Sequence, residues 1–259
     1  MITLNVPLQQ VHQFLVIFLR VTALLFVLPM FESDSNPLLF KVGLAFSVSL
    51  VLVPLVHISV APFENGLLYF TLRVTAELSV GALIGLSVRL FFAGIQMAGQ
   101  IAGFQMGIAL ANVVDPTSNT QMPFLAQFKN LFAMLIFLSI NAHHWFIKAV
   151  VESFHLIPPF DFHFGPSLFG PVMRMAADLF VLSVKIGAPL IVAMLLTSVA
   201  LGIIARTVPQ LNIFIVAMPL KILIGFIFLA FAIPFIGVYL VDLFAGLGEE
   251  IHLLMHSFH

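Results

Sequence analysis

The chain has 259 residues, of which 61% are hydrophobic and only 8% are charged. A soluble protein of this length needs far more charge to cover its surface, so the composition predicts an all-α integral membrane protein. The formal net charge of −1 excludes a nucleic-acid-binding protein. The absence of cysteine excludes disulfides, catalytic thiolates and cysteine metal sites.

Six apolar runs are long enough to cross a bilayer. In chain order they are residues 11–31, 38–57, 67–111, 123–147, 176–204 and 212–245. Each run is predicted to be helical, because lipid offers no water to unpaired backbone groups. The spacer 148–175 holds four prolines and is the one candidate for a folded segment outside the membrane. We therefore expect a single membrane domain over residues 1–259.

The run at 67–111 is too long for an ordinary span. As one helix its 45 residues would measure about 68 Å, more than twice the ~30 Å of hydrocarbon. The run must therefore break, re-enter, or leave the bilayer inside a protein shell. It also contains Arg73, Glu77 and Arg89. Arg73 and Glu77 are four residues apart and can pair along one helix face, and we expect all three charges to be buried in protein.

A glycine ladder lies near the end of the same run. Gly99, Gly103 and Gly107 recur every four residues, which puts a groove on one helix face where another backbone can approach closely. Gln96 and Gln100 lie close to this face, and in lipid their amides need partners on other helices. Two interpretations stay open: packing against helices of the same chain, or a socket for neighbouring subunits.

A polar segment at 112–122 follows the ladder, with Asp115-Pro116 as a turn starter. It is either a solvent loop or an irregular segment inside an aqueous path, where such backbone is permitted at membrane depth. Methionines gather through this part of the chain: Met97, Met106, Met122 and Met134. Their flexible thioethers could line a deformable constriction, although core packing is their ordinary use.

Asp178 and Lys185 are seven residues apart and share a helix face. We expect them to be buried charges as well, either paired through a neighbouring helix or facing a cavity, and a proton or ion relay is an alternative. A weak repeat relates residues 37–54 to 219–234, each opening on a proline with a lysine close behind. Together these features leave a secondary transporter for a small solute open as a second function.

Catalytic and cofactor motifs are absent from the sequence, so we expect neither an enzyme nor a cofactor. His252, His256 and His259 would share one face of a C-terminal helix. We expect a frayed, solvated terminus there and no metal site.

The turn between the last two apolar runs is polar. It contains Arg206, Pro209, Gln210 and Asn212, and Lys221 follows on the next helix. Pro209 can start that helix, because the first helical position needs no backbone donor. The amides suggest a surface that other chains contact, although a simple interfacial turn is the alternative. No Lys or Arg precedes Arg20 or follows Lys221, which predicts that this hairpin faces the cytoplasm.

Three stretches, in order along essentially the whole chain, resemble the FliR family of bacterial flagellar export-gate proteins. They are 99–107 with Asp115-Pro116, 137–154 with the His143-His144 pair, and 206–214 with Pro219 to Lys221. The resemblance implies a subunit of the type III secretion gate in the bacterial inner membrane at the base of the flagellum. An injectisome homologue is the alternative within the same fold.

Proteins of this family assemble with FliP- and FliQ-type subunits into a hetero-oligomeric pore of kinked helical hairpins, and FlhB-type proteins attach on the cytoplasmic side. The resemblance thus implies passage of unfolded flagellar proteins. It makes residues 1–175 a P-subunit-like part and residues 176–259 a Q-subunit-like hairpin. It maps the hairpin 206–214 to the cytoplasmic mouth and region 106–122 to a pore plug. The plug residues are Met106, Asn112, Val113, Val114, Asp115, Pro116, Thr117 and Met122.

Overall fold

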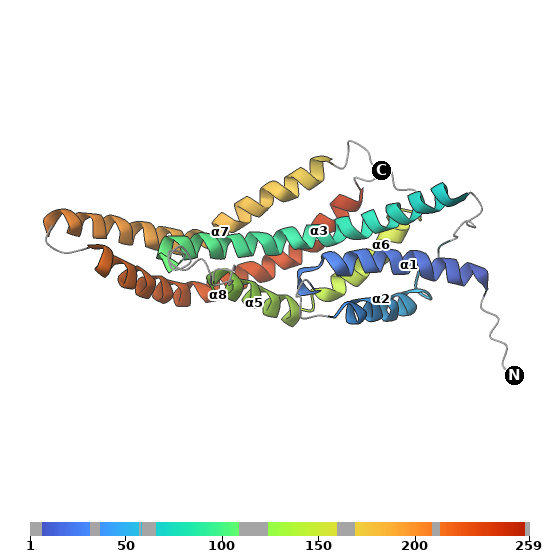
Figure 1. Ribbon diagram of the computed structural model, residues 1–259, viewed down its shortest axis with the longest axis horizontal. Helices are drawn as coiled ribbons and strands as arrows, with labels where there is room; N and C mark the ends of the chain where they lie inside the picture. Colours follow the sequence, from blue (N-terminus) through green and yellow to red (C-terminus); the bar gives the residue numbers. More distant parts are fainter. Residues whose placement is uncertain are drawn as a thin grey trace. The chain divides into compact units, whose positions relative to one another are not determined.

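The computed structural model describes residues 7–31, 37–56, 58, 66–108, 124–159, 169–208 and 213–256. The regular structure of these residues is entirely helical, which confirms the all-α prediction. The helices are α1 (Leu8–Val27), the short 3-10 helix η1 (Pro29–Phe31), α2 (Leu38–Leu52), α3 (Gly66–Met106), α5 (Phe124–Ser139), α6 (His143–Leu156), α7 (Phe169–Thr207) and α8 (Ile213–His256) (Figure 1).

Helix α3 is continuous over 41 residues, which corresponds to about 62 Å. Two of the three alternatives for this run, a break and a re-entry, are therefore wrong for the described part. The third alternative is left, a helix that leaves the hydrocarbon. The helix ends at Met106. Gly107 then adopts a φ of 81°, and its N–H donates to the carbonyl of Phe104 at 3.1 Å. Only glycine enters this backbone region without strain, which makes it an ordinary helix stop.

The run at 123–147 is two helices and not one. Helices α5 and α6 are bent by 69° at a short break where Asn141 has a φ of 56°. Helix α6 continues to Leu156, so the spacer predicted from residue 148 begins too early. At 15 residues, α2 is too short to span. The described helices thus give four candidate spans, or five if the bent pair counts as one, instead of six.

Helices α7 and α8 extend beyond their predicted ends. They have 39 and 44 residues, and they contain Pro189 and, in α8, Pro219 and Pro234. The prediction of a frayed C-terminus is wrong up to His256, because α8 continues to that residue and buries Ile251 and Leu254; His252 is exposed, and His259 lies outside the described residues. Apolar residues at helical spacing hold this last part in place.

The chain divides into two compact units. Unit 1 comprises Met1–Leu90, Asn141–Ala176 and Ala245–His259, and unit 2 comprises Phe91–Ile140 and Ala177–Phe244. Helices α3, α7 and α8 contribute residues to both. Each unit therefore draws on both halves of the chain.

In unit 1, helix α1 packs closely on α3. A Cβ on Gly81 would overlap the carbonyl oxygen of Arg20, and one on Gly85 would lie 2.8 Å from Cβ of Val27. These two glycines therefore let the helix backbones approach, as small residues do between membrane helices. The side chain of Gln13 also donates to the carbonyl of Val53 at 2.9 Å, which ties α1 to the end of α2.

In unit 2, three aromatic rings from three helices form the centre of the core. Phe92 of α3, Phe137 of α5 and Phe244 of α8 have ring centroids 5.3 to 5.8 Å apart. Two of the three pairs are edge-on, the arrangement that the aromatic quadrupole favours. The three helices are thereby joined at one point.

Candidate functional site

Unit 1 contains a buried ion cluster. The Nε of Arg20 on α1 lies 2.8 Å from Oε2 of Glu77 on α3, and the two side chains are 0% and 1% exposed. The guanidinium also donates to Oγ of Ser153 at 2.9 Å and to the carbonyl of Ile157 at 3.4 Å. Its Cζ lies 3.9 Å from the ring centroid of Phe154. The two charges neutralise each other, and residues of α1, α3 and α6 enclose them.

Two of the charges that the sequence singled out are buried. Arg73 is 7% exposed and Glu77 is 1% exposed. Arg73 donates from Nη2 to the hydroxyl of Tyr69 at 2.7 Å and stacks on that ring, with Cζ 4.0 Å from the centroid. Arg20, the ion-pair partner of Glu77, was not among the residues predicted from the sequence. The available signal was Arg20 itself, the one Lys, Arg, Asp or Glu in the apolar run 11–31.

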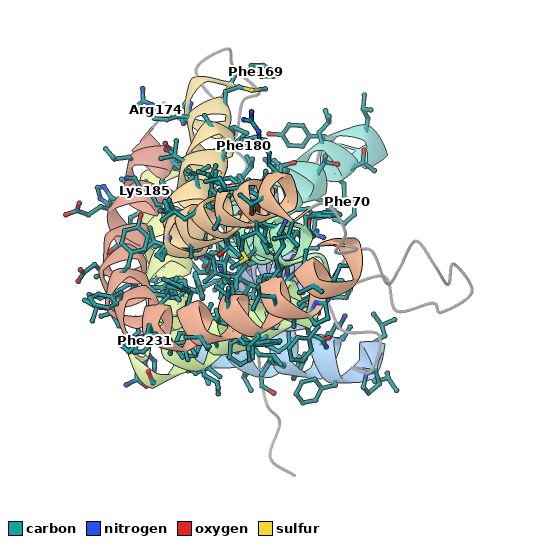
Figure 2. All side chains as sticks on the ribbon, turned by 90° about the vertical axis from the view of Figure 1, so that its left-hand side faces the viewer. Phe70, Phe169, Arg174, Phe180, Lys185 and Phe231 are labelled. Carbon is teal, nitrogen blue, oxygen red and sulfur yellow. The ribbon has the colours of Figure 1, made fainter. Side chains whose placement is uncertain are left out.

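The other three predicted buried charges are exposed in the single chain. Arg89, Asp178 and Lys185 all lie on the surface, so the burial prediction is wrong for them within this chain. On α7 the reason is helical phase. The helix buries the row Ile186, Leu190 and Met194, and Asp178 and Lys185 project to one side of this row, toward the surface. Figure 2 labels Lys185 among the side chains of this helix.

The glycine ladder packs within the chain at Gly99. A Cβ there would lie 2.5 Å from Cα of Ala126 and 2.8 Å from its nitrogen, so the backbone of α5 fills the groove. Of the neighbouring amides, Gln96 is half-buried and Gln100 is exposed. Of the two interpretations, the structure therefore supports intramolecular packing at Gly99, and Gln100 is the member of the set that remains open to other chains.

The end of α3 is anchored in unit 2. Met106 is 0% exposed, and a Cβ on Gly225 of α8 would lie 2.5 Å from its Cε. Gly103 is also buried, whereas Gly107 has open space around it. In the single chain the Met106 thioether therefore fills a core position. The remaining predicted plug residues lie outside the described residues: Asn112, Val113, Val114, Asp115, Pro116, Thr117 and Met122.

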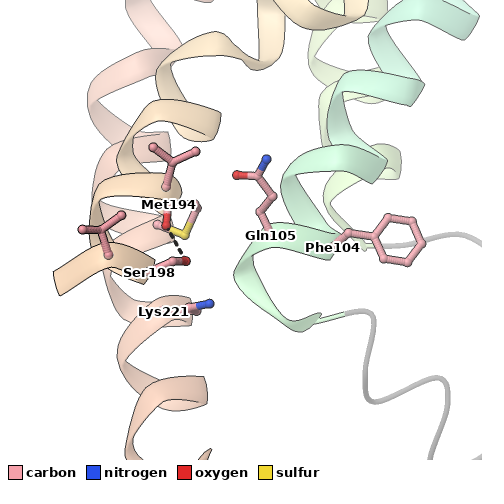
Figure 3. Close-up of a pocket in the computed structure, with 7 residues that line it drawn as sticks. Phe104, Gln105, Met194, Ser198 and Lys221 are labelled. Atoms are coloured by element: carbon pink, nitrogen blue, oxygen red, sulfur yellow. Dashed lines mark hydrogen bonds between the residues drawn. The ribbon is translucent and has the colours of Figure 1, made fainter. Parts of the chain in front are cut away.

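A pocket of about 540 Å³ opens in unit 2 between the end of α3 and the helices α7 and α8 (Figure 3). It is lined by Phe104, Gln105, Met194, Leu195, Ser198, Val199 and Lys221. The hydroxyl of Ser198 donates to the carbonyl of Met194 at 2.7 Å, as the dashed line in Figure 3 marks. Lys221 is half-buried and is the one charged residue in this lining.

The hairpin that joins α7 to α8 is described only in part. Arg206 is exposed in the last turn of α7, where the helix dipole stabilises a positive charge. Pro209, Gln210 and Asn212 lie outside the described residues. Lys221, assigned from the sequence to the same contact surface, belongs to the pocket. Within the described ranges, no three histidine or acidic side chains gather to hold a metal ion.

Large apolar side chains cover the outward faces of α7 and α8. On α7, Leu195 is 60% and Ile203 is 62% exposed. On α8, Phe231 is 71% and Phe235 is 75% exposed, and Figure 2 labels Phe231 on the ribbon of this helix. Large exposed apolar side chains in such number are typical of a surface that meets lipid or another protein.

Comparison with known proteins gives one consistent result. The family model described as "Bacterial export proteins, family 1" matches residues 11–247. The flagellar biosynthetic protein FliR of Bacillus subtilis (strain 168) is 33% identical over 245 residues, which cover 93% of this chain and 94% of that protein. FliR of Escherichia coli (strain K12) is 31% identical over 228 residues, or 88% and 86% of the two chains. FliR of Aquifex aeolicus (strain VF5) is 29% identical over 244 residues, 93% of each chain.

Proposed function

Because this chain belongs to the bacterial export proteins, family 1, we infer that it is a membrane subunit of the flagellar protein export gate. The observation that carries this inference is the extent of the match, which runs from residue 11 in α1 to residue 247 in α8. The apolar helices of spanning length agree with a membrane protein. Family membership decides against the small-solute transporter, and the flagellar names of the relatives favour the flagellar system over the injectisome.

For the assembly we propose FliP-, FliQ- and FlhB-type membrane proteins as partners, in the bacterial inner membrane at the base of the flagellum. Helix length supports a protein environment around α7, since 39 residues measure about 58 Å against ~30 Å of hydrocarbon. Its apolar side chains therefore continue beyond the reach of lipid. We propose that the cargo is unfolded polypeptide and that the subunit itself is neither an enzyme nor a cofactor carrier.

Within the subunit, we propose the division into a P-like part, 1–175, and a Q-like hairpin, 176–259. We also propose that region 106–122 forms the pore plug and that the 206–214 hairpin lies at the cytoplasmic mouth. The resemblance supports both assignments. The end of α3 supports the plug assignment, because Gly107 ends the helix within region 106–122, directly after the buried Met106.

A gene deletion with complementation tests the proposed function. Loss of this chain should abolish secretion of flagellar proteins into the medium and motility, while general secretion of signal-peptide proteins continues. The wild-type chain supplied from a plasmid should restore both. A tagged wild-type chain purified in mild detergent should bring P- and Q-type chains with it. Normal flagellar secretion in the deletion strain would overturn the proposal.

A further inference from the structure

Two side chains in the pocket of unit 2 can donate hydrogen bonds to a ligand, those of Lys221 and Gln105. Lys221 on α8 and Gln105 on α3 both line it, and Figure 3 shows their side chains reaching into the space between these helices. Among the described residues, Lys221 has no ion pair or hydrogen bond. The hydroxyl of Ser198 already donates its hydrogen bond to the carbonyl of Met194. The donors available to a ligand are therefore one ammonium and one amide.

The pocket interrupts an apolar surface. Leu195 and Val199 on α7 are 60% and 54% exposed, and Phe104 on the rim is 67% exposed. On α8 the residues after Lys221 carry no charge until Asp242. A single ammonium within such a surface needs a counter-charge, because an unpaired cation against apolar groups is costly.

The donor set fits a carboxylate. Its two oxygens can each accept a bond, one from the ammonium of Lys221 and one from the amide of Gln105, and its single charge leaves no residual charge in the pocket. A lipid phosphate is a poorer match, since anionic lipid sites between membrane helices gather several cations. Arg206, the next cation along α7, lies eight residues beyond Ser198, about 12 Å along the helix.

We propose that this pocket is the docking site for an Asp or Glu side chain on an apolar helix of another membrane subunit. The carboxylate pairs with Lys221 and accepts from Gln105, while apolar neighbours on the same helix cover Phe104, Leu195 and Val199. One charged contact in an otherwise apolar interface fixes the register of two helices. The assignment of that helix to another gate subunit rests on the proposed function.

Site-specific photo-crosslinking identifies the occupant in flagellated cells that carry the full-length chain. A benzophenone amino acid replaces Phe104 in one variant and Leu195 in another, with Phe235 as the control position because it is 75% exposed and away from the pocket lining. Both pocket positions should capture the same peptide, from a different membrane protein, with an Asp or Glu among apolar residues. Adducts with phospholipid only, or with a second copy of this chain, would overturn the proposal.

A charge exchange then tests the pairing itself. Lys221→Glu should reduce both co-purification of the captured protein and flagellar secretion at least about tenfold, because losing one charge of a desolvated pair weakens binding by more than that factor. Changing the captured acidic residue to Lys in the same strain should restore both. Lys148→Glu, on an exposed position of α6, is the matched control and should leave both unchanged.

Protein level separates a folding defect from a docking defect. The milder Lys221→Gln should keep the amount of chain in the membrane at the wild-type level and still weaken co-purification. If the wild-type chain complements the deletion while Lys221→Glu and Lys221→Gln secrete normally, the docking site is wrong and the proposed function stands. If the wild-type chain itself does not restore secretion, the proposed function fails first.

Discussion

The ion pair between Arg20 and Glu77 holds three helices of unit 1 together, and removing one partner should destabilise the chain strongly. Glu77→Leu leaves a guanidinium that is 0% exposed and has lost its counter-charge. Breaking a buried pair from one side costs about 3–5 kcal/mol. Arg20 keeps its bonds to Ser153 and Ile157 and its contact with Phe154. We therefore expect the free energy of unfolding to fall by about 3 kcal/mol, the lower end of that range.

Arg20→Met should cost more than Glu77→Leu. It removes the ion pair, the bonds to Ser153 and Ile157 and the contact with Phe154, and the carboxylate of Glu77 is 1% exposed. We expect about 5 kcal/mol, a large share of the 5–15 kcal/mol that a folded chain has in total. The double variant should cost less than either single change, since an apolar pair of similar volume often replaces a buried ion pair at little loss.

The assay is a double-mutant cycle on the chain purified in mild detergent, with the free energy of unfolding from denaturant titration and the melting temperature as a second readout. Glu152→Leu, at an exposed position of α6, is the control and should stay within about 0.5 kcal/mol of the wild type. Losses of the two single variants that simply add in the double variant would refute the reasoning, and so would single variants as stable as the wild type.

Three further outcomes follow from the packing of unit 2 and from the plug assignment. Gly99→Ala should destabilise the chain by about 1–3 kcal/mol because the new Cβ meets the backbone of α5, whereas Gly43→Ala in open space should be neutral or stabilising by up to about 1 kcal/mol in the same titration. Phe244→Ala should cost about 3–5 kcal/mol and Phe235→Ala less than about 0.5 kcal/mol, since the first ring is 0% and the second 75% exposed; equal losses would contradict the core assignment. Deleting residues 112–120 should leave co-purification with the partner subunits intact and raise ion conductance of the gate in planar bilayers, and unchanged conductance would count against the plug.

The sequence predicted the helices better than it predicted their continuity. Apolar runs located most of the helices because lipid excludes unpaired backbone, a rule that acts on local composition, whereas most of α6 fell in the predicted spacer 148–175. The alternatives of a break or re-entry in 67–111 came from bilayer thickness, which is not a property of the local sequence. Nothing in that run stops a helix before Gly107, and α3 is accordingly unbroken. The bend at Asn141 was missed because the whole run 123–147 was assigned from its length and mean apolarity, although the polar residues Ser139, Asn141, His143 and His144 gather at the break.

In the candidate site, too, the sequence predicted local features and did not predict contacts between distant residues. Spacing alone identified the glycine ladder, yet it could not say whether the helix that fills the groove at Gly99 belongs to this chain or to another. Arg20 escaped notice because its partners Glu77 and Ser153 are 57 and 133 residues away along the chain. Helical periodicity finds pairs three or four residues apart and carries no information about such distant ones.

Two groups of charged residues act at different stages, one in the folding of the single chain and one in its assembly with other chains. Arg20 and Glu77 are neutralised inside unit 1, so they govern whether the single chain folds. Asp178, Lys185 and Lys221 have no ion pair within the described part of the chain; Asp178 and Lys185 are exposed and Lys221 is half-buried. A membrane protein that functioned alone would have to bear their cost permanently. Changes to the first group should therefore lower the stability of the isolated subunit, and changes to the second should leave that stability intact and weaken its assembly with other chains.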